Sequence, residues 1–185
     1  MSRKTLIING SPRIHGDTAA LIGELCRHLH GEFTELSAFR AELAPCIDCR
    51  ACRNVRGCVF DDDMRAVYAD DFDALVIASP VYFSNLPGPL LSLASRLQPL
   101  HNAEYYLGNP TTPRPKLGGL IFTGGGKGNE AGAIRAVRPV FRLLNASGFD
   151  EHTVLSMHTD TLPAAEDHAA LDGVRKLAAW LNGAQ

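Results

Sequence analysis

A short, uninterrupted apolar run in the middle of the chain constrains its fold more than any other feature of the sequence. Residues 74–79 (ALVIAS) form this run, and Pro80 ends it. Such a run is typical of a strand buried on both faces of a parallel sheet. Four further runs of this kind, the second of them weaker, cover residues 5–9, 33–36, 117–123 and 153–157. The sequence therefore predicts a sheet of short, buried strands.

Between these runs, apolar residues recur at helical spacing. Helices are predicted in the segments at residues 17–29, 61–69, 89–97, 134–144 and 171–181. Asp17 is expected to cap the first helix, and Pro89 suits the first turn of the third. Pro139 lies inside the fourth and costs roughly 3 kcal/mol in a helix interior. A kink or a late helix start is expected there.

Strands that alternate with helices predict an α/β domain on a parallel sheet. Five strands in 185 residues suggest a flavodoxin-like three-layer sandwich, a doubly wound fold with the strand order 2-1-3-4-5. We expect residues 1–185 to form a single domain with a cysteine-rich loop at residues 45–60. The ligand of such a sheet binds at the carboxyl ends of the strands, where the strand order reverses.

Charge and hydropathy exclude two classes of function. With 18 Lys and Arg against 20 Asp and Glu, the formal net charge is −2, so the chain lacks the basic field of nucleic-acid binders. No apolar run approaches the roughly 20 residues of a membrane-spanning helix. The start of the chain has too few apolar residues for a signal peptide. We therefore expect a cytoplasmic protein that binds neither nucleic acid nor membrane.

The loop after the first strand, residues 10–18, carries groups that suit a phosphate monoester. Ser11 and Thr18 supply hydroxyls, Arg13 supplies a positive charge, and a helix N-terminus follows. The alternative is a capped turn without a ligand. Asp17 would repel a phosphate, so its side chain is expected to point away and cap the helix.

Two further loops follow the third and fourth strands. Tyr82 and Phe83 stand between prolines after the third strand, and such a rigid, partly apolar platform suits a flat tricyclic ring. Alternatively, the two aromatics merely cover the core. Residues 123–128 (TGGGKG) follow the fourth strand, and their glycines let the backbone approach a ligand closely, although a flexible turn has the same composition.

Taken in order, the motifs resemble the NADPH-dependent FMN reductase family. They are GSPR-x-x-G-x-T, CIDCRACRNVRGCVFDDDM, SPVYFSNLPGPL and the TGGG turn. The resemblance covers about residues 4–150. Within the family, the cysteine segment is similar to that of the iron–sulfur flavoproteins.

The resemblance implies that the three loops bind FMN. The residues implied are Ser11, Arg13 and Thr18 for the phosphate, Pro80, Val81, Tyr82 and Phe83 for the isoalloxazine ring, and Thr123, Gly124 and Gly125 for the far side of the cofactor. It also implies NAD(P)H as co-substrate and a homodimer or tetramer with flavin sites near the interface. Residues 105–115, rich in proline and polar residues, are the expected interface loop.

Cys46, Cys49, Cys52 and Cys58 have the spacing C-x2-C-x2-C-x5-C. Three closely spaced thiolates and a fourth farther on can hold a [4Fe–4S] cluster, and interleaved arginines would favour thiolates. Free thiols are the main alternative, and zinc or a disulfide is a further one. Cys26, on the apolar face of the first helix, is interpreted as a core residue.

These features together predict an FMN-dependent NAD(P)H oxidoreductase of the flavin or quinone reductase type that passes electrons to an unidentified acceptor. No catalytic acid or base is predicted, because hydride transfer to a flavin need not use one. One alternative is an iron–sulfur flavoprotein that carries electrons without its own NAD(P)H site. Another is a redox sensor based on the flavin or the cluster.

Overall fold

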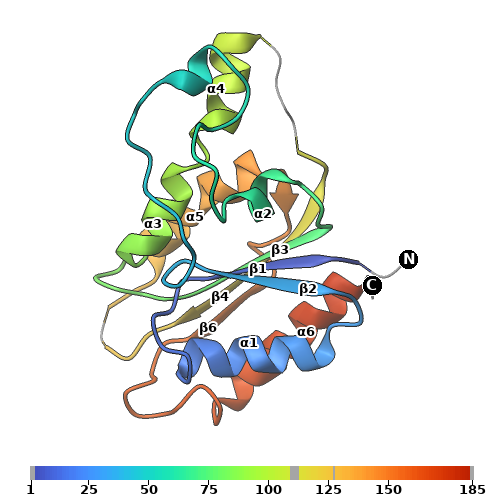
Figure 1. Cartoon of the computed structure of the whole chain (residues 1–185). Coiled ribbons are helices and arrows are strands. Elements are labelled where there is room, and N and C mark those ends of the chain that lie inside the picture. The colour runs from blue at the N-terminus through green and yellow to red at the C-terminus, as the bar shows by residue number, and fades with distance from the viewer. Residues whose placement is uncertain (1–2, 109–112, 127, 184–185) are drawn as a thin grey trace.

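The computed structural model describes residues 3–108, 113–126 and 128–183. Its centre is a parallel sheet in the order β2-β1-β3-β4, with β5 and β6 both on the outer side of β4 (Figure 1). The main strands are β1 (Thr5–Asn9), β2 (Phe33–Ser37), β3 (Ala74–Pro80) and β4 (Lys116–Thr123). The predicted flavodoxin-like fold and its strand order are therefore confirmed.

The fifth position of the sheet is shared by two short strands. β5 (Ala146–Ser147) pairs with the start of β4, and β6 (Thr153–Ser156) pairs with its end. Between them, residues 148–152 form a turn that begins at Gly148, whose φ of +87° suits glycine. The single fifth strand expected from the sequence is thus one of two segments along the same edge.

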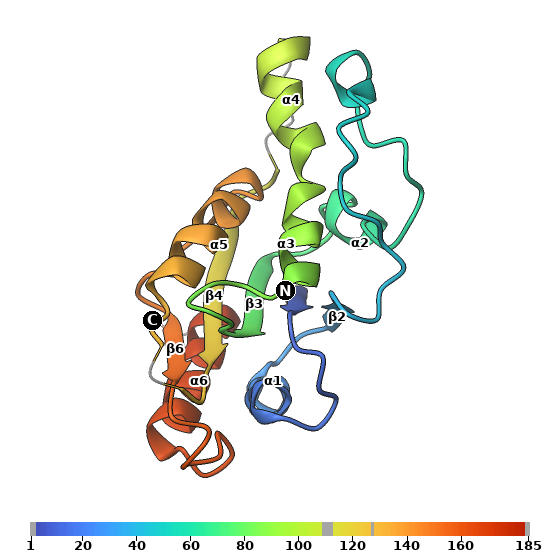
Figure 2. The ribbon, with the colours of Figure 1, turned by 90° about the vertical axis from the view of Figure 1, so that its left-hand side faces the viewer.

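Alternate residues of each central strand pack into different cores. In β1, Leu6 and Ile8 join the core beneath α2 (Arg65–Tyr68), α3 (Gly88–Ser95) and α5 (Ala131–Leu143). Ile7 joins the core beneath α1 (Asp17–His28) and α6 (His168–Asn182). Figures 1 and 2 show these helices on the two sides of the sheet. The three-layer arrangement follows from strands that are apolar on both faces.

Several helix boundaries differ from the expectation. Gly16, not Asp17, is the N-cap of α1, and the first turn has no side-chain cap. α2 is a single turn, much shorter than the predicted segment at residues 61–69. α5 begins at Ala131 and runs through Pro139, so the expected late start is wrong. Its buried apolar face holds the helix in place despite the lost backbone bond.

The sequence gives no sign of α4 (Gln98–Leu107), which follows α3 after a short break. α4 packs against η1 (Ala51–Arg53), a 3₁₀ turn within the cysteine-rich loop. Both views show α4 extending beyond the sheet. Of its residues, Leu100 packs against the core beneath α2, α3 and α5, while much of the helix contacts the cysteine-rich loop. No helix in the described ranges combines the length and apolar character needed to cross a bilayer.

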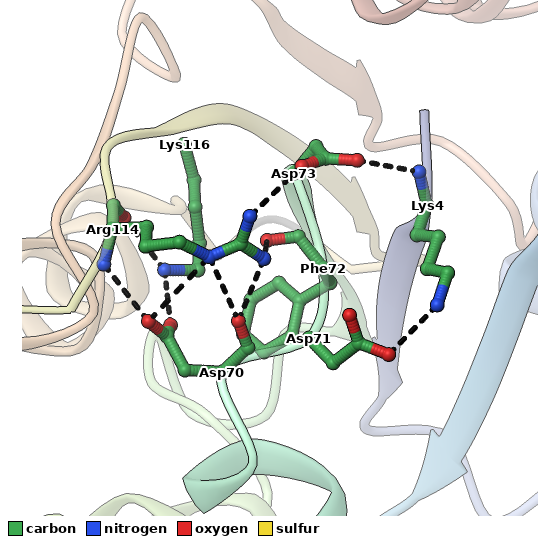
Figure 3. A network of polar contacts seen from close by, with 7 residues as sticks. All are labelled: Lys4, Asp70, Asp71, Phe72, Asp73, Arg114 and Lys116. Carbon is green, nitrogen blue, oxygen red and sulfur yellow. Dashed lines mark hydrogen bonds and ion pairs between the residues drawn. The ribbon is translucent and has the colours of Figure 1, made fainter. Parts of the chain in front are cut away.

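A polar network joins the amino-terminal ends of β1, β3 and β4 (Figure 3). Its buried member is Lys116, which forms an ion pair with Asp70, donates to the carbonyl oxygen of Arg114 at 2.6 Å and lies over the Phe72 ring. Asp70 also accepts a bond of 2.9 Å from the backbone N–H of Arg114. At its exposed end, Lys4 pairs with Asp71 at 2.7 Å. The network holds the first residues of these three strands next to one another.

We expect Lys116→Met to lower the free energy of unfolding by about 2 kcal/mol, because it removes the buried ammonium that pairs with Asp70 and leaves Asp70 with only its contacts to Arg114. Urea unfolding measures the change. Lys4→Met is the matched control, since the ion pair of Lys4 is exposed to solvent, and it should have a much smaller effect. Equal losses for the two variants would contradict a structural role for the buried pair.

Candidate functional site

A pocket opens at the carboxyl ends of β1, β3 and β4, with a cavity of about 260 Å³. The loops after these three strands and the loop after β6 supply its walls. The lining residues are Ser11, Arg13, Asp17, Thr18, Pro80, Val81, Tyr82, Thr123, Gly124, Gly125, Gly126, Thr159 and Asp160. Every residue that the sequence predicted for these loops, except Phe83, lies in this wall.

Phe83 differs from the prediction because the turn that carries it points it into solvent. Its side chain is fully exposed and is not part of the pocket wall. Phe83 and Ser84 both have left-handed φ angles, of +50° and +58°. Tyr82 and Asn85 close the turn with backbone hydrogen bonds of 2.8 and 2.9 Å. Tyr82 stays in the wall and is partly exposed, so its ring remains available to a ligand.

The first and third loops are joined by a buried pair of hydroxyls. Thr18 Oγ1 and Thr123 Oγ1 lie 2.8 Å apart, and both residues are buried. In the first loop, the backbone N–H of Arg13 donates to Ser11 Oγ at 3.2 Å. These bonds shape the pocket floor. The Arg13 side chain is exposed, and within the described ranges its guanidinium has no hydrogen-bond or ion-pair partner.

Gly10 allows the first loop to pass close to the end of β3. A Cβ atom at this position would lie 2.6 Å from Ser79 Oγ and 2.7 Å from Leu90 Cδ2. A side chain there would push the first loop away from the second. The glycine of the GSPR motif therefore has a packing role in bringing the pocket walls together.

Asp17 does not cap α1, which corrects the expectation from the sequence. Its carboxylate instead accepts a hydrogen bond of 2.9 Å from the backbone N–H of Ala164. This bond ties the start of α1 to the loop after β6. The same loop brings Thr159 and Asp160 into the pocket wall. Neither residue was predicted, because the site was expected only in the loops after the first, third and fourth strands.

All four clustered cysteines line a second, smaller pocket, whose cavity is about 40 Å³. Cys46 donates its backbone N–H to Ser95 Oγ at 3.0 Å, and Asn102 Nδ2 donates to Cys52 Sγ at 3.0 Å. Every cysteine is a free thiol, so the disulfide alternative is not present here. Within the described part of the chain, no three His, Cys, Asp or Glu side chains are placed to hold a metal ion.

A buried arginine stands at the back of this second pocket. Arg96 is 1% exposed and pairs with Asp62 through both guanidinium Nη atoms. Burial disfavours the charged form of Asp62, but hydrogen bonds from Arg96 and from the backbone N–H of Met64 hold the pKa of Asp62 below its usual value. The pair is therefore ionised at neutral pH.

Two arginine N–H groups beside the cysteines have no acceptor in the described structure. Arg53 Nε and Arg96 Nε are both buried and unpaired, and both residues line the cysteine pocket. A buried donor on a charged group is costly when it stays unsatisfied. The donor set around the four thiols is therefore suited to an anionic group with several acceptor atoms.

Cys26 is separate from this site. It is half-buried against the core beneath α1 and α6, and burial raises the pKa of its thiol to about 11. Its interpretation as a core residue agrees with this packing.

The sequence matches a protein-family profile and two relatives of similar length. The profile of the family described as NADPH-dependent FMN reductase matches residues 3–160. An iron–sulfur flavoprotein of Methanosarcina thermophila is 32% identical over 136 residues, which cover 70% of this chain and 68% of the relative. A second iron–sulfur flavoprotein, from Methanocaldococcus jannaschii, is 30% identical over 75% of this chain and 71% of its own length.

Solved structures share the fold at lower identity. An azoreductase from Bacillus anthracis has a TM-score of 0.63 and 19% identity, and the match covers 98% of this chain and 99% of the azoreductase. An FMN-dependent NADH-azoreductase from the same species, solved in complex with FMN, has a TM-score of 0.61 and 14% identity, with 97% and 100% coverage. At these identities the likeness concerns the fold alone.

Proposed function

Because the chain belongs to the NADPH-dependent FMN reductase family and is an FMN-dependent oxidoreductase, we propose that the pocket at the carboxyl ends of β1, β3 and β4 binds FMN. The protein would then move electrons from NAD(P)H to an acceptor. One observation carries this proposal: the three loops that the sequence singles out meet in one pocket at the point where the strand order reverses.

The phosphate end of FMN would bind the loop between β1 and α1. Arg13 offers an exposed positive charge without a protein partner in the described ranges, and the first backbone N–H groups of α1 point out of its N-terminus. Ser11 and Thr18 complete the proposed set, with Thr18 acting mainly by holding the first loop to the third. Asp17 also lines this pocket, and the backbone N–H of Ala164 holds its carboxylate in place.

The ring end of FMN would lie against the loop after β3. Pro80, Val81 and Tyr82 line the pocket side by side with Thr123, Gly124 and Gly125, because Pro80 pairs with Thr123 where β3 and β4 end. A role for Phe83 in this wall stays a prediction from the resemblance. When bound, FMN supplies a ring that accepts hydride and passes electrons on. The protein positions the ring, and no acid or base is proposed.

The cysteine pocket favours a second redox group in the same chain, in addition to FMN. We propose that Cys46, Cys49, Cys52 and Cys58 ligate a [4Fe–4S] cluster, as the names of the two relatives suggest for those proteins. The support is that one pocket gathers all four thiols and two unpaired arginine N–H groups. Since the thiols are not arranged for a metal ion here, the loop would have to adjust around the cluster.

Assembly as a homodimer or tetramer is also a proposal. Tyr105 and Tyr106 on α4 are exposed aromatic side chains, which are enriched at protein interfaces. They begin the predicted interface loop at residues 105–115, of which residues 109–112 lie outside the described part of the chain.

The phosphate site is tested with two flavins. Arg13→Ala should weaken FMN binding by roughly 10- to 100-fold, the value of one charge-assisted hydrogen bond, and should weaken riboflavin binding far less because riboflavin has no phosphate. Fluorescence titration measures both affinities. Arg138→Ala, which removes an exposed arginine of α5 that pairs with Asp150, is the control. An equal loss for both flavins would place the phosphate elsewhere.

Steady-state oxidation of NADH and NADPH with a dye acceptor tests the overall reaction. We expect the FMN-loaded protein to oxidise at least one nucleotide, because an open flavin ring can stack with a nicotinamide. If the bound flavin is reduced by dithionite but by neither nucleotide, the protein is an electron carrier without its own NAD(P)H site.

The cluster is tested by anaerobic reconstitution with iron and sulfide. Wild-type protein should bind about four irons and four sulfides per chain, as the cysteine ligation rule requires. Alanine at any one of the four clustered cysteines should reduce bound iron. Cys26→Ala is the matched control and should retain full iron, because Cys26 lies in the core on the other side of the sheet. Protein that holds FMN but no iron would contradict the cluster.

A further inference from the structure

One strongly buried charge has no part in the proposed flavin chemistry. Arg96 follows α3 directly, and its side chain is fully buried. Nη1 donates to the carbonyl oxygen of Ala44 at 2.8 Å and to Asp62. Nη2 donates to Asp62 Oδ1 at 3.2 Å and to Cys58 Sγ at 3.4 Å. The guanidinium carbon also lies 4.8 Å from the centre of the Phe60 ring.

Through these contacts, Arg96 binds both ends of the cysteine-rich loop. Ala44 stands before the first clustered cysteine, while Cys58 and Asp62 stand at and after the last. One planar guanidinium therefore holds the entry and the exit of the loop together. Lysine has one ammonium group and could not reproduce this forked arrangement. The position of the fourth cysteine thus depends on a residue of a different element.

The same side chain places a positive charge next to the thiols, where water does not screen it. In such surroundings a charge acts more strongly than at the surface. Hydrogen bonds to the sulfurs, net charge and solvent exposure are the features that set the reduction potential of a cysteine-ligated cluster. Arg96 supplies a hydrogen bond to the sulfur of Cys58 and adds a positive charge beside the thiols. The negative charge of Asp62 acts on the reduction potential in the opposite direction.

We propose that Arg96 is the positioning residue of the cysteine site, and that its buried charge raises the reduction potential of the cluster. This inference rests on the cluster proposed above. A bound cluster would gain one negative charge when one electron from reduced flavin reduces it, with no bond broken. The buried guanidinium of Arg96 would therefore stabilise the reduced state more than the oxidised one.

The test compares two variants of the buried pair, one that removes its positive charge and one that removes its negative charge. Full-length wild type, Arg96→Gln and Asp62→Asn are reconstituted anaerobically. Iron content, FMN content and the cluster's midpoint potential in a dithionite titration are measured. Arg96→Gln should lower the potential, and Asp62→Asn should raise it. Arg56→Gln is the matched control: it removes an exposed arginine two residues from Cys58, so solvent screening should make its shift smaller than that of Arg96→Gln.

The proposal is overturned if iron-loaded Arg96→Gln titrates at the wild-type potential, or if the two variants shift in the same direction. Where Arg96→Gln loses its iron or its fold, Asp62→Asn decides, since an unchanged or lower potential in that variant contradicts the role of the charge. A wild-type protein that keeps FMN but binds no iron defeats the cluster and this inference with it. Iron-loaded wild type with unshifted variants defeats only the role of Arg96.

Discussion

Parallel pairing of the three central strands at one register is the constraint on which the rest of the molecule depends. Asn9 of β1 pairs with Ala78 of β3, and Pro80 of β3 pairs with Thr123 of β4. The strands therefore end at the same edge of the sheet, and the loops that leave them meet there. The register also sends Leu6 and Ile7 into opposite cores. A slip of one residue would exchange the two faces and separate the loops.

Helix α3 connects the two candidate sites. The loop that contributes Tyr82 to the flavin pocket leads into its first turn, and Arg96 of the cysteine pocket follows its last. Its eight residues rise by about 12 Å. Because Leu90 and Leu93 fix this helix against the sheet, the orientation of one pocket relative to the other is set by packing in the core. The proposed flavin pocket and the cysteine pocket thus share one helix as a support.

The two pockets are held together by different kinds of interaction. The proposed flavin pocket is fixed mainly by strand ends and by neutral hydrogen bonds such as that between Thr18 and Thr123. The cysteine-rich loop leaves its large aliphatic side chains exposed, and its ends are fixed by contacts of Arg96 with Asp62 and Cys58. Removing either charge of the Arg96–Asp62 pair would leave the other one buried and unpaired, and would destabilise this loop. In the proposed flavin pocket, no buried ion pair holds the lining loops together among the described residues.

Much of this protein follows from local patterns. The apolar run at residues 74–79 predicts a central strand because a strand buried on both faces must be apolar throughout, and the loops after such strands predict the pocket. The sequence did not predict α4, which packs on a loop, or the outward position of Phe83, which depends on left-handed backbone angles at two residues that are not glycine. Nor did it predict that Arg96 binds both ends of the cysteine-rich loop, since its partner Ala44 is 52 residues away along the chain. The sequence by itself determined where the four main strands lie and which loops follow them, because apolar runs and strand-end residues are local patterns, whereas the strand order was expected from the fold class. Only the tertiary structure decided which distant side chains surround the cysteines, because those contacts exist only after the chain has folded.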